Sequence, residues 1–64
     1  MLDRAYIQNK YIFKNGNALA WIENGYIYDY KESKCLFYIQ GNYIYSMNGG
    51  KCLFYINNDW IYKM

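Results

Sequence analysis

Short apolar runs, broken by pairs of polar turn-forming residues, recur along this chain. Each run reads aromatic-Ile-x, two turn residues, then aromatic-Ile-aromatic, as in Trp21-Ile22-Glu23, Asn24-Gly25 and Tyr26-Ile27-Tyr28. A two-residue loop of the Asn-Gly type between aromatic and β-branched residues is the strongest short-range sign of a β-hairpin. Each run therefore predicts a tight hairpin. Asn24-Gly25 suits a type I′ turn best and Asn9-Lys10 worst, because Lys tolerates a left-handed backbone poorly.

The hairpins form an internal repeat. Ala18 to Lys34, Cys35 to Lys51 and Cys52 to Met64 align without a gap at a period of 17 residues, and residues 1–17 hold an earlier copy with a shorter joining loop. A repeat of this kind cannot bury its apolar face alone and must pack on its neighbours. The 64 residues thus predict one domain of four repeats, at about 1–17, 18–34, 35–51 and 52–64.

Alternation along the strands sorts the side chains into two sets. A two-residue loop pairs Ile7 with Ile12, Ile22 with Ile27, Ile39 with Ile44 and Ile56 with Ile61, so all eight isoleucines share one face. Regular alternation adds to that face Ala18, Ala20, Cys35, Phe37, Cys52 and Phe54. The opposite face receives the other aromatic residues, which are Tyr6, Tyr11, Phe13, Trp21, Tyr26, Tyr28, Tyr30, Tyr38, Tyr43, Tyr45, Tyr55, Trp60 and Tyr62. This sorting specifies the register strongly, because a slip of one residue would exchange the two faces.

The segments that join the hairpins are too short for a crossover helix, so consecutive hairpins are expected to pair as an antiparallel meander. Closing eight short strands into a ring removes the two unpaired edges of an open sheet. The predicted fold is all-β: four tandem hairpins closed into a shallow pseudo-fourfold antiparallel barrel or flower. An open solenoid is the alternative.

The repeated pattern of aromatic, Ile, x, Asn/Gly pair, aromatic, Ile, Tyr resembles the bacterial four-fold β-flower proteins, over Tyr6 to Met64. That resemblance implies four hairpins arranged radially around an apolar centre, ligand binding, and no catalytic residues to transfer. A weaker resemblance is to choline-binding aromatic hairpin repeats, in which neighbouring hairpins form aromatic cages for a quaternary ammonium. Those repeats are longer and begin with Gly-Trp, which is missing here.

The chemistry of the side chains argues against catalysis. The chain has no histidine, and its only serines are Ser33 and Ser46. Nucleophile-and-base sets such as Ser/His/Asp therefore cannot form. Cys35 and Cys52 are expected to be buried free thiols, and two thiols without histidine do not make an ordinary metal site. We expect a protein that is not an enzyme and has no metal or cofactor.

No apolar run approaches the length of about 18 residues that a membrane-spanning helix needs, and the N-terminus has no signal-peptide pattern. The expected location is the cytoplasm. Ile, Asn, Lys, Tyr and Phe dominate the sequence, and their A/T-rich codons indicate a bacterial or phage origin.

The favoured functional hypothesis is binding of a small amphipathic or anionic ligand, lipid-like or nucleotide-like, in a central opening with aromatic walls and a lysine rim. The candidate residues are Trp21, Tyr28, Tyr38, Tyr45, Tyr55, Trp60 and Tyr62, with Lys34 and Lys51 for positive charge. Because so large an aromatic face needs cover, we also expect a homo-oligomer.

Two other functions stay open. One is a protein-interaction or inhibitor module that docks on a host protein through its Tyr and Trp side chains, for example a phage anti-defence protein. The other is a choline-binding-like module. Nucleic-acid binding ranks lower, since the net charge is only +2 and tight binding to phosphates needs more basic side chains.

Overall fold

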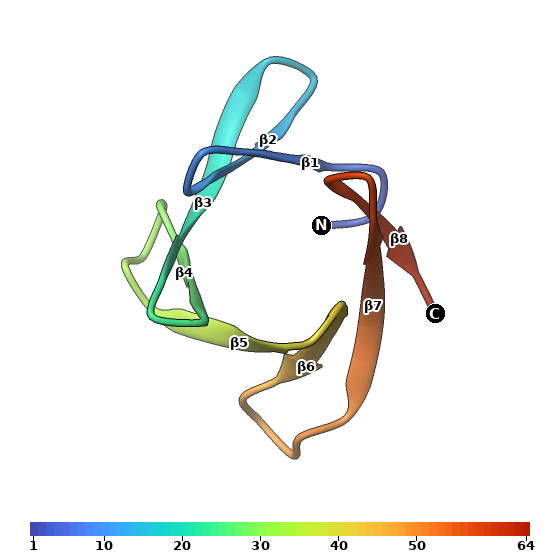
Figure 1. Cartoon of the computed structure of the whole chain (residues 1–64). Coiled ribbons are helices and arrows are strands. Elements are labelled where there is room, and N and C mark those ends of the chain that lie inside the picture. Colours follow the sequence, from blue (N-terminus) through green and yellow to red (C-terminus); the bar gives the residue numbers. More distant parts are fainter.

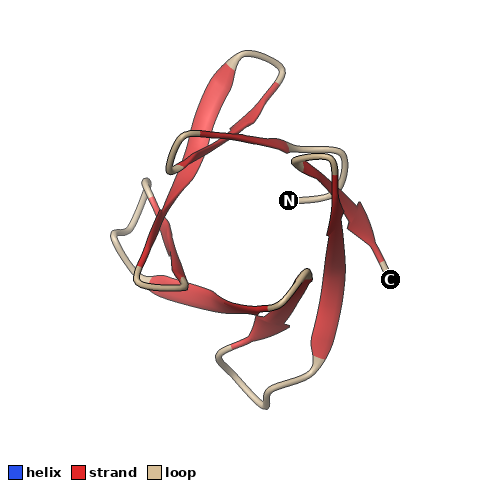
Figure 2. Cartoon of the chain, viewed as in Figure 1, coloured by secondary structure: helices blue, strands red, loops and turns tan.

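The chain forms eight antiparallel strands that close into a barrel (Figure 1), and the computed structural model describes all of residues 1–64. The strands are β1 (Tyr6–Gln8), β2 (Tyr11–Lys14), β3 (Asn17–Glu23), β4 (Tyr26–Asp29), β5 (Cys35–Gln40), β6 (Tyr43–Ser46), β7 (Cys52–Asn57) and β8 (Trp60–Lys63). Only loops and turns connect them (Figure 2). The predicted all-β barrel of four hairpins is confirmed. None of its segments is a helix of the length and apolarity that crossing a bilayer requires.

The strands pair in the predicted hairpin registers. Ile22 lies opposite Ile27, and the same Ile–Ile pair recurs in the other three hairpins. Asn24 and Gly25 both have positive φ, as a type I′ turn requires, at 54° and 82°. In the first hairpin only Asn9 does, at 58°, and Lys10 avoids the left-handed region. Lys10 therefore departs from a type I′ turn as expected, but Asn9-Lys10 is not the single poorest fit. In the third hairpin, too, only the first turn residue, Gly41 at 62°, has positive φ.

The barrel is a flattened ring with extents of 29 × 26 × 19 Å. Seen down its axis, the four hairpins are arranged around a common centre, and the joining loops between hairpins flare outward (Figure 1). The shape agrees with the predicted shallow pseudo-fourfold flower.

Isoleucines fill the interior, as predicted. Those of the second strands, Ile12, Ile27, Ile44 and Ile61, are completely buried, and those of the first strands pack against them. Phe37 and Phe54 also pack against this core, with their rings edge to face at 5.9 Å between centroids. At the positions equivalent to these phenylalanines the first half of the chain has Ala5 and Ala20, both fully buried. The fully buried Leu2 belongs to the same cluster and supplies volume that the alanines lack.

A one-residue bulge interrupts each joint between consecutive hairpins. The pairing skips Leu19, Leu36 and Leu53 in turn, so that Cys35 lies opposite Tyr28 and Cys52 opposite Tyr45. An extra residue in one strand reverses the face of the side chains beyond it. The prediction that Ala18, Cys35 and Cys52 join the isoleucines is therefore wrong: they share the face of their aromatic partners. The two cysteines are half-buried and free.

The N-terminal residues close the ring between β1 and β8. Strand pairing there consists of Tyr6 opposite Trp60. Around it, the Ile61 amide donates to the Ala5 carbonyl at 2.8 Å, and the Arg4 amide donates to the Ile61 carbonyl at 2.7 Å. The Lys63 amide donates to a carboxylate oxygen of Asp3 at 3.0 Å. The N-terminus consequently lies inside the ring (Figure 1).

Candidate functional site

The outer face of every hairpin carries a pair of contacting aromatic rings. The rings lie opposite each other on the two strands of one hairpin, with centroids 5.1 to 5.6 Å apart. The pairs are Tyr6 with Phe13, Trp21 with Tyr28, Tyr38 with Tyr45, and Tyr55 with Tyr62. Each contact joins two members of the predicted outer aromatic set, so the face sorting of these rings is confirmed. Offset stacking of this kind stabilises the hairpin by about 0.5 to 1.5 kcal/mol per pair beyond the area buried.

A second set of aromatic pairs spans the junctions between neighbouring hairpins. Tyr11 lies opposite Trp21, Tyr26 opposite Tyr38, Tyr43 opposite Tyr55, and Tyr6 opposite Trp60. At the β8/β1 junction the Tyr6 and Trp60 rings are in contact, with centroids 5.3 Å apart and planes tilted by 50°. At the other three junctions the paired rings do not touch, and each junction contains a hollow. The pseudo-fourfold fold thus has three open junctions and one closed junction.

The largest hollow lies at the β6/β7 junction and has a volume of about 450 Å³. It is lined by Asn42, Tyr43, Tyr55, Ile56, Asn57 and Met64. Ligand pockets commonly measure about 300 to 1,000 Å³, so this hollow alone has the size of an ordinary ligand site. Tyr43 is 46% exposed and Tyr55 38% exposed, which leaves part of both rings free for contact.

The β4/β5 hollow repeats this composition at a smaller volume of about 240 Å³. Its lining consists of Asn24, Gly25, Tyr26, Tyr38, Ile39 and Gln40. Two tyrosines, one first-strand isoleucine and two amide side chains are therefore common to both hollows. The likeness follows from the repeat, because Tyr26 and Tyr43, Tyr38 and Tyr55, and Gln40 and Asn57 are equivalent positions.

The β2/β3 hollow differs because its polar groups are charged and already engaged. It is lined by Lys10, Tyr11, Trp21, Glu23 and Tyr30, at about 250 Å³. A carboxylate oxygen of Glu23 accepts a hydrogen bond from the Trp21 indole N–H at 3.3 Å. The Lys10 ammonium lies 5.9 Å from the centroid of the Tyr11 ring. Thus a cation of the chain itself already contacts the aromatic wall.

Tyr30 extends the aromatic wall of this β2/β3 hollow. Its ring stacks on Tyr11 with centroids 6.2 Å apart and contacts Trp21 at 5.0 Å. Desolvation by these neighbours raises the pKa of Tyr30, and the charge and hydroxyl of Tyr11 raise it further.

Some of the predicted aromatic residues line the hollows, and others stack against the rings that do. Trp21, Tyr38 and Tyr55 line one hollow each. Three more support those rings by stacking: Tyr28, Tyr45 and Tyr62. Trp60 belongs to the closed junction and is 43% exposed.

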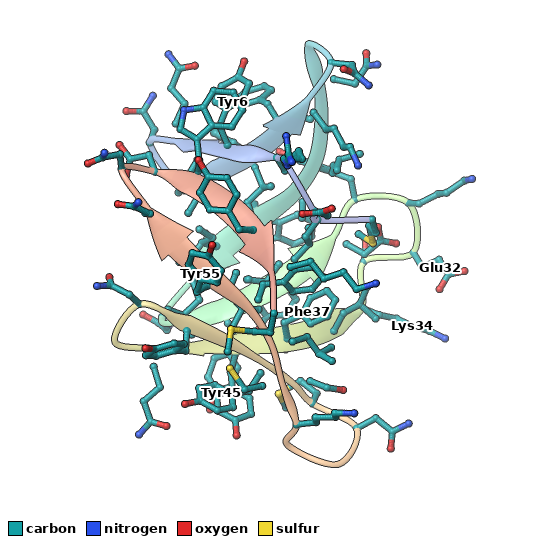
Figure 3. The ribbon with its side chains drawn as sticks, turned by 90° about the vertical axis from the view of Figure 1, so that its right-hand side faces the viewer. Tyr6, Glu32, Lys34, Phe37, Tyr45 and Tyr55 are labelled. Carbon is teal, nitrogen blue, oxygen red and sulfur yellow. The ribbon has the colours of Figure 1, made fainter.

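The structure does not bring the two predicted lysines to these rings. Lys34 and Lys51 are exposed and line none of the hollows. Lys34 forms a solvent-exposed ion pair with Glu32 at 3.8 Å. Lys34 and Glu32 extend away from the barrel on one side, whereas Tyr6 and Tyr55 lie toward the other (Figure 3).

The centre of the ring is also not where the hollows lie. Fully buried side chains, including Leu2 and Ala5, occupy it, and Phe37 points into the same interior (Figure 3). The predicted central opening is therefore wrong, and the hollows lie at the junctions between hairpins instead. Nowhere do three or more His, Cys, Asp or Glu side chains come together as metal ligands.

Sequence reasoning missed the second wall of each hollow, formed by Tyr11, Tyr26 and Tyr43. It also missed the polar residues at the rim, such as Asn42 and Asn57. The repeat could have identified these three tyrosines. Trp60 is a predicted site residue, and Tyr11, Tyr26 and Tyr43 occupy the equivalent position in the other repeats.

Comparison with protein-family models, curated proteins and solved structures finds no match to this chain. The resemblance to β-flower proteins stays a prediction, and the junction hollows are interpreted from their own geometry.

Proposed function

We propose that this chain is a non-enzymatic binding protein that holds a small amphipathic ligand in the hollow between β6 and β7. The observation that carries the proposal is the contrast between two equivalent junctions. Tyr6 and Trp60 close one by ring contact, whereas Tyr43 and Tyr55, paired in the same way, leave a hollow of about 450 Å³.

The lining of this hollow suits a ligand with an apolar surface and a polar edge. Two aromatic rings, Ile56 and Met64 supply apolar contact, and two amide side chains supply hydrogen-bonding groups. No lysine or arginine lines the hollow. This composition favours the amphipathic alternative over the anionic one, since a buried or half-buried anion needs a positive partner.

Titration of the ¹⁵N-labelled protein with indole, choline and adenosine monophosphate, followed by amide chemical shifts, tests this proposal. Indole presents a flat apolar ring, choline a cation, and the nucleotide an anion. We expect indole to shift the amides of Tyr55, Ile56 and Asn57, with weaker effects at the β4/β5 hollow. Shifts scattered over the surface, or none for all three probes in a folded sample, would argue against the proposal.

A matched pair of variants at Tyr43 makes the test specific. Tyr43→Trp gives the β6/β7 junction the residue that fills the β8/β1 junction, so indole binding at Tyr55 should be lost. Tyr43→Phe keeps the ring size and should retain binding. Equal binding by both variants would show that the space between these rings is not the site.

The second candidate function is docking on a host protein, as an interaction or inhibitor module. It is favoured by three exposed aromatic side chains at equivalent positions: Tyr26 at 42%, Tyr43 at 46% and Trp60 at 43%. Tyrosine and tryptophan dominate the energetic centres of protein interfaces. Recovery of a partner by the natural chain but not by Trp60→Ala would support this function, and equal recovery by both would exclude this surface. Self-association through the same residues stays a prediction.

A further inference from the structure

We infer that the ligand of the β6/β7 hollow is a neutral saccharide, bound through a pyranose ring of glucose configuration between Tyr43 and Tyr55. This inference rests on the proposed function, because it specifies the ligand class of the same hollow. It follows from three features of the lining: where the rings are, where the amides are, and which of these groups lack a partner within the protein.

Tyr43 on β6 and Tyr55 on β7 lie directly opposite each other in the strand pairing, and both residues line the hollow. An aromatic ring has a negative face, which attracts groups with slight positive charge. The C–H bonds of a pyranose are such groups. In β-glucose every hydroxyl is equatorial, so both flat faces of the sugar present axial C–H bonds. A ligand with two C–H faces can contact both of the aromatic rings that line the hollow.

The polar groups of the hollow are amides rather than charges. Tyr55 and Asn57 alternate with Ile56 along β7, so Asn57 lies on the same face as the Tyr55 ring. Asn42 approaches from the turn before β6. A side-chain amide both donates and accepts hydrogen bonds, as a sugar hydroxyl does. Equatorial hydroxyls radiate from the edge of the pyranose, where these amides can reach them.

Both amides are free to bind a ligand. Neither the Asn42 nor the Asn57 side chain hydrogen-bonds within the protein, and the same holds for the Tyr43 and Tyr55 hydroxyls. The contrast is the β2/β3 hollow, where Glu23 occupies the position of Asn57 and accepts the Trp21 indole N–H. A nucleotide is disfavoured at β6/β7 because no basic side chain of the lining could bind its phosphate.

Two sugars that differ at one hydroxyl test the inference directly. Methyl β-glucopyranoside has C–H bonds on both faces, whereas methyl β-galactopyranoside turns its 4-hydroxyl onto one face. Each is titrated into the ¹⁵N-labelled protein to millimolar concentration, with indole as the reference probe for the hollow. We expect the glucoside to shift the side-chain NH₂ signals of Asn42 and Asn57 and the Tyr55 amide, and the galactoside to bind more weakly.

The variants separate the role of the amide from that of the rings. Asn57→Ala should weaken glucoside binding about tenfold, the effect of losing one hydrogen bond worth about 1.4 kcal/mol. It should weaken indole binding much less, because indole has a single N–H group and contacts the hollow mainly through its ring. Gln8→Ala is the matched control, since Gln8 is the equivalent residue beside the closed junction, and should change neither. Asn42→Ala, at an exposed turn, gives a second reading should Asn57→Ala disturb the fold.

The outcomes distinguish this inference from the proposed function. Indole binding at the hollow without glucoside binding would overturn the saccharide and leave the proposed function intact. Equal affinity for the two glycosides would overturn the sandwich between the two rings. If neither indole nor the glucoside shifted the signals of the residues that line the hollow, the inference and the proposed function would both be overturned.

Discussion

The β6/β7 and β8/β1 junctions are built from equivalent residues, yet one is open and the other closed. At β6/β7 the strands are covalently joined through residues 47–51, and three residue pairs hold the register. At β8/β1 one residue pair and the N-terminal segment make the closure. The open junction can leave its rings apart because the chain connection holds the strands together. At the closed junction, Trp60 and Tyr6 add an aromatic contact where the backbone pairing is shortest.

The largest expected effect comes from removing Leu2, the buried residue at the closing segment. Leu2→Ala should cost about 2 to 5 kcal/mol of unfolding free energy, the range for buried leucines, because it leaves a cavity beside Ala5 and Ala20. Chemical denaturation measures the loss. Hydrogen exchange should accelerate at the Ile61 and Ile7 amides, which donate to Ala5 and Asp59 across the closure.

The matched control for Leu2→Ala is Leu53→Ala, at the bulge of the β6/β7 junction, where the leucine is only half-buried. Leu53→Ala should lower the free energy of unfolding by less than Leu2→Ala does. It should not cause local opening at the β8/β1 junction, so hydrogen exchange of the Ile61 and Ile7 amides should not accelerate by that route. If both variants lost the same stability, Leu2 would have no special role in closing the ring.

Truncating the junction rings should have unequal costs. Trp60→Ala removes the ring contact with Tyr6 and should destabilise the fold by about 1 to 2 kcal/mol. Tyr43→Ala, at the equivalent exposed position of the open junction, should change stability by about 0.5 kcal/mol. Thermal or denaturant unfolding of the two variants side by side decides the point. A larger loss for Tyr43→Ala would mean that the open junction depends on its rings more than the closed one does.

The most local effect concerns Asp3, whose carboxylate accepts the Lys63 amide at 3.0 Å. Asp3→Ala should cost about 0.5 to 1.5 kcal/mol, as for a single hydrogen bond at an exposed site. Asp29→Ala is the control, because its carboxylate accepts the Glu32 amide at the same distance of 3.0 Å but within one joining loop. Only Asp3→Ala should speed exchange of the Lys63 amide; an equal effect of Asp29→Ala there would contradict the assignment.

The sequence specifies what depends on local pattern. The hairpin turns follow from residues such as Asn24-Gly25, and the alternation of aromatic and Ile residues determines the two faces. The ring closure is also predictable, from the unpaired edges that an open sheet would carry. Within each hairpin, therefore, the register and the facing aromatic rings follow from the order of the residues alone.

Features that depend on packing between hairpins are not predictable in the same way. The bulges at Leu19, Leu36 and Leu53 lie inside runs that resemble regular strands, so regular alternation puts Cys35 and Cys52 on the wrong face. The shifted register at each joint is also what sets Tyr43 opposite Tyr55. The position of Lys34, which points into solvent beside Glu32, depends on a loop with no pattern of its own.

The packing of residues 1–5 into the centre of the barrel is not predictable from the sequence, for a related reason. Residues 1–5 contain no hairpin signal, and only their alignment with the other repeats makes Ala5 equivalent to Ala20. The need for Leu2 follows from the small volume of those alanines, which is a property of the assembled core. Such a residue cannot be recognised from its own neighbours in the sequence.

The most direct test of the account exchanges the two residues that open and close the junctions. In the double variant Tyr43→Trp with Trp60→Tyr, the β6/β7 junction should close and the β8/β1 junction should open. Amide shifts on addition of indole should then move from Tyr55 and Ile56 to their equivalents Tyr6 and Ile7. Shifts that stayed at Tyr55 and Ile56 in the folded double variant would contradict the claim that the space between paired rings is the binding site.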